Sequence, residues 1–556
     1  MELTFVRADH EVTGSCHALH VGDKNILVDY GMEQGKDLFQ NIPLPVAPED
    51  VDYCLITHAH IDHTGMLPEL YAKGFRGTII CTKATKELSD IMLRDSAHIQ
   101  MQDAEYNNKK AEKRGIKTKE EPLYTMQDTM NVLQRFKAYP YDEIFEVCEG
   151  VKARFTDIGH LLGSASIELW LTENGQTRKI VFSGDIGNTN QPLLQDPKTT
   201  SSADYVVMES TYGDRYHEKQ KGRHKEQLAE VIENTMKCGG NVVIPAFAVG
   251  RTQAILYFIR QIKEQNLVPS YPDFPVYVDS PMAVSSTNIF ENNDIECYDE
   301  EAKAMVARGA NPLSFPNLHL SITTQESIAI NEDPEPKVII SASGMCDAGR
   351  IRHHLKHNIS NPNATILFVG YQSEGTLGRR LLSGASKVKI FGTEYEVKAH
   401  IAQMDGLSGH ADKDGLLSWI NAFEEKPKQV FVVHGDDEAA TSFAECLSSE
   451  YGYEAMAPYS GTKYDLLAGS FIRIAKPVLI KKEAKLEEGV QTTRETVGEV
   501  SETKGGKKKG TVLDSYSKLQ IAARRLNRLI ENSEGMSGKE LDEFTKEINR
   551  LCRKYK

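Results

Sequence analysis

The sequence has 556 residues, of which 40% are hydrophobic and 26% charged, so it describes a globular protein that is too long for a single hydrophobic core. No apolar stretch approaches the roughly 18 residues of a membrane span, and the first residues lack the basic and apolar plan of a signal peptide. We therefore expect a cytoplasmic protein without membrane association. The net charge of −14 excludes a uniformly basic surface, although local Lys and Arg grooves are compatible with it and would bind nucleic acid.

Short runs of β-forming residues alternate with helical segments from the start of the chain to about residue 475. The runs predicted to be strands, which lead into Gly, Ser or charged residues, are NILVDYG, GTIICT, KIVFSGDIG, YVVMESTYG, NVVIPAFAVG, VYVDSP, KVIISASG, TILFVGY and QVFVVHGD. Residues 94–140 interrupt the alternation with a polar helical insertion rich in Lys, Glu, Gln and Met. The pattern predicts an α/β fold.

The sequence after residue 475 changes character twice. Residues 476–510 are charged, lack apolar periodicity and end in Gly and Lys, which predicts a linker. Residues 511–556 carry apolar side chains at spacings of three and four, and Ser537 with Glu540 forms a capping box for a second helix. We predict a helical hairpin in this basic tail. Its basic face is either a solvated helix surface or a docking site for RNA or a partner.

The stretch LITHAHIDHTG places His58, His60, Asp62 and His63 directly after a predicted strand. Neighbouring imidazoles repel one another when protonated, and a metal ion is the usual reason for holding several of them together. Catalytic residues also favour the ends of strands. We therefore interpret this cluster as metal ligands rather than as a solvated, His-rich loop.

Four further candidate residues stand at the ends of separate predicted strands. They are Asp29 in LVDYG, His160 in DIGHLLGSA, Asp185 in FSGDIG and His434 in VVHGD. Each alone is more often a turn residue or a structural residue. Two neighbouring metal ions need about seven side chains from several elements and one bridging carboxylate, which the combined set supplies. Imidazole and carboxylate without thiolate favour zinc, although Mn²⁺ or Fe²⁺ also fit such ligands.

The order D…HxHxDH…H…D…H resembles the metallo-β-lactamase superfamily. Further motifs look like those of its β-CASP branch of nucleases, namely ESTYGDR, IPAFAVGRTQ, SASGMCDAGR, YQSEGTLGRRL, SGHAD and VHGD. The resemblance implies a four-layer αβ/βα sandwich into which a smaller α/β domain is inserted. It places the two parts of the metallo-β-lactamase domain at 1–205 and 395–475 and the inserted β-CASP domain at 206–394.

The resemblance also implies a role for each candidate residue. The implied ligands are His58, His60 and His160 for one zinc ion, Asp62, His63 and His434 for the other, and Asp185 as the bridge between the two ions. Asp29 would orient ligands from behind. Glu209 of ESTYGDR would orient His410 of SGHAD, which would face the scissile phosphate and protonate the departing 3′ oxygen. The candidate catalytic residues are Asp62, Asp185, Glu209 and His410.

The implied activity is hydrolysis of single-stranded RNA by a hydroxide that two zinc ions activate, leaving 5′-phosphate and 3′-hydroxyl ends. Cleavage within the strand and removal of nucleotides from the 5′ end are both left open, as is a homodimer. Two alternatives use the same residues: a hydrolase of small esters, thioesters or lactams, and a catalytically silent RNA-binding scaffold. The long insertion and the SGHAD motif disfavour the first, and the complete ligand set disfavours the second.

Glycine-containing loops and arginines of the expected insertion are candidate phosphate contacts. They are Ser343 and Gly344 in SASGM, together with Arg251, Arg350, Arg379 and Arg380. Simple βα turns and surface salt bridges would explain the same residues. His353 and His357 stand four apart on one predicted helix, but they lack a third ligand and the Glu of H-E-x-x-H, so they predict an exposed helix surface.

Overall fold

The structure is a computed structural model that describes residues 1–35, 38–113, 119–217, 223–293, 295–373, 375–404, 408–480, 526 and 538–554. The chain divides into two compact units, Met1–Lys481 and Lys482–Lys556. In the second unit, α15 (Gly538–Lys554) coincides with the second helix expected in the tail. Apart from residue 526, the first helix of that hairpin and residues 481–510 of the linker lie outside the described residues. No helix in the described part of the chain has the length and apolar composition needed to cross a membrane.

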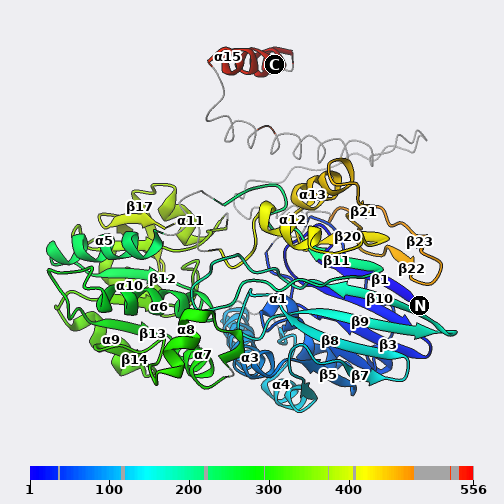
Figure 1. The fold of residues 1–556 in the computed structure, drawn as a ribbon. Coiled ribbons are helices and arrows are strands. Elements are labelled where there is room, and N and C mark those ends of the chain that lie inside the picture. Colours follow the sequence, from blue (N-terminus) through cyan, green and yellow to red (C-terminus); the bar gives the residue numbers. More distant parts are fainter. Residues whose placement is uncertain are drawn as a thin grey trace, which may run out of the picture. The chain divides into compact units, whose positions relative to one another are not determined.

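Two mixed sheets form one half of the first unit (Figure 1). In spatial order, the eight strands of one sheet are β23 (Ser470–Arg473), β22 (Lys463–Asp465), β1 (Glu2–Arg7), β2 (Cys16–Val21), β3 (Lys24–Val28), β4 (Tyr53–Leu55), β5 (Thr78–Cys81) and β6 (Phe136–Ala138). The seven strands of the other are β21 (Ala455–Met456), β20 (Gln429–Val433), β11 (Tyr205–Glu209), β10 (Gln176–Phe182), β9 (Ala165–Glu173), β8 (Val151–Asp157) and β7 (Phe145–Cys148). Both sheets combine strands from the two ends of the unit, because β1 pairs with β22 and β11 pairs with β20.

Helices cover these sheets and the sheet of the inserted domain. The α-helices of the first unit are α1 (Ile61–Thr64), α2 (Leu67–Ala72), α3 (Lys83–Lys113), α4 (Met126–Leu133), α5 (His224–Lys237), α6 (Arg251–Glu264), α7 (Pro281–Asn292), α8 (Glu300–Ala307), α9 (Thr324–Glu332), α10 (Ile351–Asn358), α11 (Leu377–Leu382), α12 (Lys413–Asn421) and α13 (Asp437–Ser449). Short 3-10 turns occur at η1 (Pro48–Asp50) and η2 (Ile295–Cys297). The long helix α3 begins before the polar insertion expected at 94–140, because its first turns bury apolar side chains such as Leu88 and Met92.

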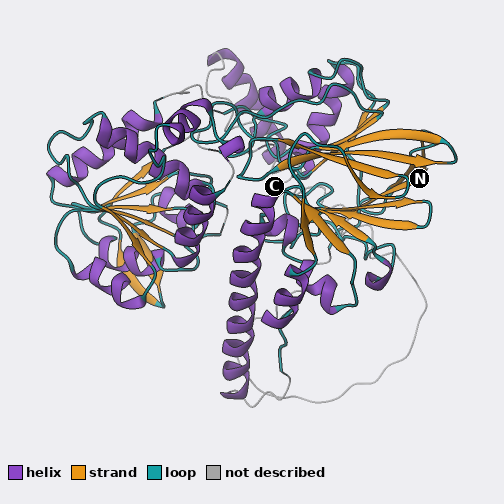
Figure 2. Cartoon of the chain, turned by 60° about the horizontal axis from the view of Figure 1, so that its bottom comes forward, coloured by secondary structure: helices purple, strands orange, loops and turns teal. Residues whose placement is uncertain are grey.

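The two mixed sheets pack face to face through the inward-pointing residues of alternating strands. Leu3, Phe155 and Phe431 are among the fully buried side chains of this interior. Leu70 of α2 belongs to the core on one outer face, and Trp419 of α12 belongs to the core on the other. The order of layers is therefore helix, sheet, sheet, helix, as the resemblance to the metallo-β-lactamase superfamily implied. Figure 2 shows the helices outside the strands of this sandwich.

The inserted domain is a parallel sheet covered by helices on both faces. Its six strands, in spatial order, are β14 (Leu318–Ser321), β13 (Val276–Asp279), β15 (Val338–Ser341), β12 (Val242–Pro245), β16 (Thr365–Phe368) and β19 (His400–Gln403). All of their pairings are parallel. One core includes residues of α5, α6 and α7, and the other includes residues of α9, α10 and α11. A separate hairpin contains β17 (Lys387–Ile390) and β18 (Thr393–Glu396).

The pairing of strands locates the two crossings between the domains. The expected boundary between residues 205 and 206 falls inside β11, whose partners β10 and β20 both lie in the seven-stranded sheet. The expected boundary between residues 394 and 395 falls inside β18, and the strand after it, β19, pairs with β16 of the inserted sheet. Both crossings therefore come later in the chain than the motifs indicated, because motifs mark loops and carry no information on which strands pair.

Several of the predicted site residues follow the carboxyl ends of parallel strands. Strands β3 and β4 pair in parallel in one sheet, and β10, β11 and β20 pair in parallel in the other. Asp29 follows β3, Asp185 follows β10, Glu209 ends β11, and His434 follows β20. Because parallel strands end at a common edge, these side chains from distant parts of the sequence meet at one place.

Candidate metal centre

The HAHIDH cluster spans the loop after β4 and the first residues of α1. Helix α1 begins directly after His60, which is its N-cap residue. His58 and His60 therefore project from the loop, whereas Asp62 and His63 project from the short helix. The four side chains are attached to two different elements, so they can take part in two separate groups.

A backbone segment runs against this turn and requires glycine at position 31. Tyr30 N donates to His63 O over 2.8 Å, and Ser15 N donates to Asp62 O over 2.8 Å. A Cβ on Gly31 would lie 1.6 Å from the Asp62 backbone oxygen, so a larger residue would displace the turn. These contacts determine where Asp62 and His63 stand.

The predicted ligands gather in two groups, and within each group the ligand atoms lie within 4.8 Å of one another. The first contains His58, His60, His160 and Asp185, and the second contains Asp62, His63 and His434. Asp185 Oδ2 lies 3.4 Å from His58 Nε2 and 3.6 Å from His160 Nε2. Asp185 Oδ1 lies 3.3 Å from His63 Nε2 and 3.6 Å from His434 Nδ1. One carboxylate therefore faces both groups.

The packing of the rings fits a site for cations. His60 Nδ1 lies 3.0 Å from His58 Nε2 and 3.2 Å from His160 Nε2, so several nitrogen lone pairs converge. Asp185 Oδ1 is buried and has no hydrogen-bond partner among the described residues. Burial, followed by the neighbouring His63, lowers the pKa of His58 well below its ordinary value, which keeps this ring neutral and able to bind a metal. This donor set suits a divalent ion such as zinc.

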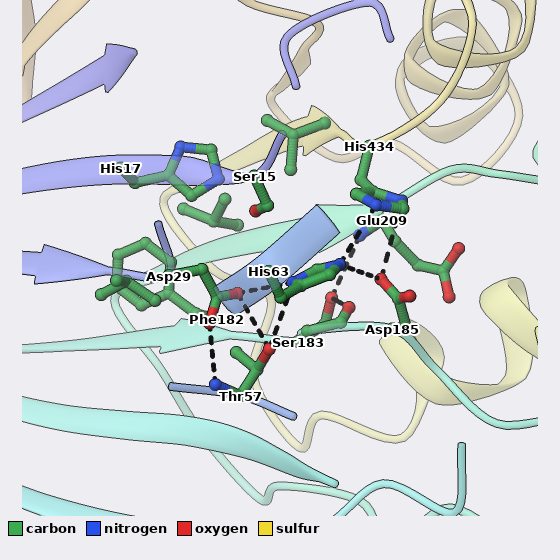
Figure 3. A pocket seen from close by; sticks show the side chains of 14 residues that line it. Ser15, His17, Asp29, Thr57, His63, Phe182, Ser183, Asp185, Glu209 and His434 are labelled. Carbon is green, nitrogen blue, oxygen red and sulfur yellow. Dashed lines mark hydrogen bonds and ion pairs between the residues drawn. The ribbon is translucent and has the colours of Figure 1, made fainter. Parts of the chain in front are cut away.

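Asp29 holds His63 from behind, as Figure 3 shows. His63 Nδ1 lies 2.8 Å from Asp29 Oδ2. Thr57 secures the same carboxylate, since its backbone N donates to Oδ1 and its hydroxyl donates to Oδ2, each over 2.8 Å. Such an outer partner fixes the orientation of a ligating ring. The sequence reasoning did not include Thr57, although its position directly before the first histidine of the motif was a usable signal.

Glu209, His410 and Asp185 form a third group of converging polar atoms. His410 Nδ1 lies 3.2 Å from Glu209 Oε1, which also accepts from Ile186 N over 2.5 Å. Burial disfavours the charged imidazole, but the carboxylates of Glu209 and Asp185 outweigh it and raise the pKa of His410 to about 9. Glu209 engages Nδ1, so Nε2 is the nitrogen that can face a substrate.

A small cavity lies behind His63 and Asp29 (Figure 3). Its volume is about 20 Å³, and its lining includes Ser15, His17 and Ser183. This volume suits one water molecule. Burial, followed by His63, lowers the pKa of His17 to about 3, so this ring adds no positive charge beside the ligands.

Comparison with known families agrees with the geometry of the site. The metallo-β-lactamase superfamily model matches residues 11–220, and the β-CASP domain model matches residues 252–381. A model described as a Zn-dependent metallo-hydrolase RNA specificity domain matches residues 394–458. The three matches follow one another along the first unit in the order of the folded domains.

Ribonuclease TTHA0252 of Thermus thermophilus is 36% identical over 442 residues, which cover 79% of this chain and 94% of that relative. The chain belongs to the β-CASP nucleases. It is therefore a metal-dependent hydrolase of the metallo-β-lactamase superfamily. Transcription termination factor FttA of Methanosarcina mazei is 29% identical over 462 residues, covering 80% of this chain and 69% of the relative. An RNase J-like protein of Methanocaldococcus jannaschii is 29% identical over 462 residues, covering 83% and 98% respectively.

The arginines expected to contact phosphate in this β-CASP nuclease differ in whether they already form an ion pair. Arg350 Nη1 lies 2.6 Å from Asp279 Oδ1, and its Nη2 donates to Ile322 O over 2.5 Å. The guanidinium of Arg350 is thus already paired with a buried carboxylate, which differs from the expected phosphate contact. Arg251 and Arg379 have no ion pair among the residues that the structure describes, so their charges are available to a ligand.

The SASGM loop lies farther from a helix start than the sequence indicated. Helix α10 begins only at Ile351, and a turn in which Cys346 N donates to Ser343 O over 3.2 Å stands between the loop and the helix. Helix α6 does begin directly after its glycine, since Gly250 is the N-cap residue with a φ of +78°. Of the two glycine loops, the one before Arg251 therefore has the arrangement that suits an anion.

The inserted domain contains a buried pair, His354 and Asp279, that the sequence did not predict. His354 Nε2 lies 2.7 Å from Asp279 Oδ2, and both side chains are fully buried. Burial raises the pKa of Asp279, but hydrogen bonds led by that from His354 lower it to about 2. His354 shares the apolar face of its helix, which was the available signal. His353 and His357 are exposed on their helix, as predicted.

Proposed function

We propose that the protein is a zinc-dependent ribonuclease that hydrolyses phosphodiester bonds of single-stranded RNA, with two zinc ions per chain. The position of Asp185 carries this proposal, because its two carboxylate oxygens face two separate groups of histidines. A carboxylate shared in this way is typical of two-metal hydrolases. The names of the relatives and the RNA specificity domain favour RNA as the substrate. Mn²⁺ and Fe²⁺ are the alternative metals.

The proposal assigns the ligands by their grouping. One ion is assigned to His58, His60 and His160, the other to Asp62, His63 and His434, and Asp185 is assigned as the bridge. Asp29 and Thr57 orient His63. Two divalent ions bound at these side chains would supply a water molecule of lowered pKa and positive charge beside the phosphate.

His410 is the residue that we assign as the general acid. Glu209 holds its Nδ1, and the carboxylate charge raises the pKa of the imidazole, which favours the protonated form. In the reaction the attacking water first loses a proton to the solvent; a bond then forms between its oxygen and phosphorus, and the bond between phosphorus and the 3′ oxygen breaks. The proton of His410 passes to that 3′ oxygen, which leaves as a hydroxyl. The products carry a 5′-phosphate and a 3′-hydroxyl.

Binding of the phosphates beside the cleaved bond requires positively charged side chains that do not already form ion pairs within the protein. Arg251 and Arg379 are assigned to this role because neither has an ion pair among the described residues. Ser343 and Gly344 lie in the loop after β15, at the same edge of the inserted sheet as the start of α6. We assign them as further contacts to the RNA backbone.

Metal content and RNA cleavage together test this proposal. Elemental analysis of the full chain should find about two zinc ions, and Asp62→Ala or His63→Ala should abolish cleavage and empty one position. The matched control is His357→Ala, which changes an exposed histidine and should affect neither quantity. A folded and active protein that contains no transition metal would overturn the assignment.

A time course on RNA labelled at the 5′ end or internally tests the mode of cleavage. Early products of many lengths would identify cleavage within the strand, and release of mononucleotides from the 5′ end would identify an exonuclease. Nitrocefin is the comparison substrate for small-molecule hydrolysis. Faster turnover of nitrocefin than of RNA would contradict the proposed substrate class.

A further inference from the structure

Two large aromatic side chains stand open to solvent at the carboxyl edge of the inserted sheet. Phe247 follows β12 and is 49% exposed, and Tyr371 follows β16 and is 59% exposed. Strands β12 and β16 are neighbours in the sheet. Large apolar side chains gathered at one exposed edge mark a binding surface more often than single ones scattered over a protein.

Both rings stand on loops that contact the SASGM loop, which follows β15. A Cβ added to Gly344 would lie 3.2 Å from the ring of Phe247, so this ring packs against a bare glycine. Gln372 is buried, and its Nε2 donates to Gly344 O over 2.9 Å and to Tyr371 O over 3.1 Å. The loops are therefore tied to one another. A surface fixed before it meets its ligand loses less entropy when it binds.

Two segments of the chain connect this edge of the inserted sheet to the candidate metal centre. Strand β19 pairs with β16 and continues towards the SGHAD motif that contains His410. The loop after β12 runs from Phe247 to Gly250, where an added Cβ would lie 3.1 Å from Leu161 Cδ1. Leu161 is adjacent to His160, one of the predicted metal ligands. A chain extended over the two rings would therefore reach the site of hydrolysis.

Three arginines lie on the segments that follow the two aromatic rings. Arg251 directly follows the loop of Phe247, and Arg379 and Arg380 are exposed on α11, which follows Tyr371. None of the three arginines has an ion pair among the residues described by the structure. Alternation of exposed rings with unpaired cations is typical of surfaces that bind single-stranded nucleic acid, because bases stack on rings while phosphates contact the cations.

We propose that Phe247 and Tyr371 form a base-stacking platform for unpaired nucleotides of the RNA substrate. This inference rests on the proposed function, since it takes the bound strand to be the one that is cleaved. Stacking on a phenyl or phenol ring accepts every base, so the platform would favour unpaired RNA without a strict sequence preference. A double-stranded segment would present no base faces to these rings.

Binding of oligoadenylate and of a ribose-phosphate chain without bases tests the platform. Each full-length variant carries Asp62→Ala as well, so that no cleavage occurs during the measurement by fluorescence anisotropy. Phe247→Ala and Tyr371→Ala should each raise the Kd for oligoadenylate roughly 5- to 140-fold, which corresponds to the usual loss for one stacked base. The Kd for the chain without bases should not change.

Two control variants accompany this measurement. Tyr271 is 38% exposed and precedes β13, at the opposite edge of the sheet, so Tyr271→Ala should leave both affinities unchanged. Phe247→Tyr keeps a ring and should retain the affinity for oligoadenylate. The platform is refuted if the two ring variants bind oligoadenylate as tightly as Tyr271→Ala does, which is also the result expected of a surface for a protein partner. It is equally refuted if they lose affinity for both chains alike.

A small substrate separates failure of the platform from failure of the proposed function. Bis(p-nitrophenyl) phosphate is a phosphodiester that does not extend over the two rings. With Asp62 intact, Phe247→Ala and Tyr371→Ala should hydrolyse it at the wild-type rate, which also confirms that they are folded. If the wild-type protein hydrolyses neither this diester nor RNA, the proposed function fails; if it hydrolyses both and the ring variants bind RNA normally, only the platform fails.

Discussion

Replacing His410 by Ala should slow RNA cleavage without emptying the metal centre. An alkoxide is a poor leaving group, and a positioned acid contributes about 10²- to 10⁴-fold to the rate, which is about 2.7–5.4 kcal/mol of barrier. The Glu209 carboxylate raises the pKa of His410 and so favours the protonated imidazole, and His410→Ala should lose this factor. His410 Nδ1 lies 3.9 Å from Asp185 Oδ2, farther than the nearest nitrogens of His58, His160, His63 and His434, so metal content should stay unchanged.

The assay compares two leaving groups in the same oligonucleotide. One substrate has the natural 3′ oxygen at the cleaved bond, and the other has sulfur, which departs as a thiolate without needing a proton. The His410→Ala variant should therefore recover much of its lost rate on the sulfur substrate. Sulfur also binds zinc, so the wild-type protein is measured on both substrates and the ratios are compared.

Two results would refute this reasoning. Equal loss on the oxygen and sulfur substrates, with metal content unchanged, would leave His410 as a positioning residue. A loss of zinc in His410→Ala would make it a ligand. The variant Glu209→Gln gives a related measurement, because it keeps a hydrogen-bonding side chain beside His410 Nδ1 but removes the charge that raises the pKa. Its rate on the oxygen substrate should fall by less than that of His410→Ala.

Three further predictions concern the fold around the site. Gly31→Ala should lower zinc content and RNA cleavage together, measured by elemental analysis and turnover, because the new Cβ would displace the backbone of Asp62. Asp279→Ala should destabilise the protein by about 3 kcal/mol or more in urea unfolding, since it leaves Arg350 and His354 without their buried partner; a change below about 1 kcal/mol would contradict this. A chain ending near residue 480 should keep its kcat on a short oligonucleotide, because the tail belongs to a separate compact unit.

The strands could be predicted because their signals are local, whereas the order of the layers was implied by the resemblance to the metallo-β-lactamase superfamily. Each predicted run from NILVDYG to QVFVVHGD forms a strand, and the helix, sheet, sheet, helix order agrees with the expected sandwich. The limits of the inserted domain could not be placed in the same way. Whether β11 and β19 belong to one sheet or another depends on pairing with strands far away in the sequence, and alternation of residues is the same in either case.

The layer of candidate ligands could likewise be recognised, because it consists of histidines and carboxylates at or near strand ends. The residues behind that layer were harder to find. In the sequence, Thr57 is an ordinary residue at the end of a predicted strand, and only the fold places Asp29 beside it. The pair of Asp279 and His354 joins positions on a strand and a helix, and its partners are decided by packing. Phe247 and Tyr371 become conspicuous only once their exposure is known, since hydrophobicity alone predicts burial.

The two arginines that follow glycine in GRTQ and GRIR show why strand order decides which cation is available to a substrate. Arg350 comes after β15, which pairs with β13, and β13 ends in Asp279. The carboxylate therefore lies within reach of Arg350 and neutralises it. Arg251 comes after β12, whose two neighbours end in Ser341 and Phe368, so neither strand ends in a carboxylate. Equivalent sequence contexts thus produce one structural arginine and one arginine free to bind phosphate, and the difference comes from the order β13, β15, β12, β16 in the sheet.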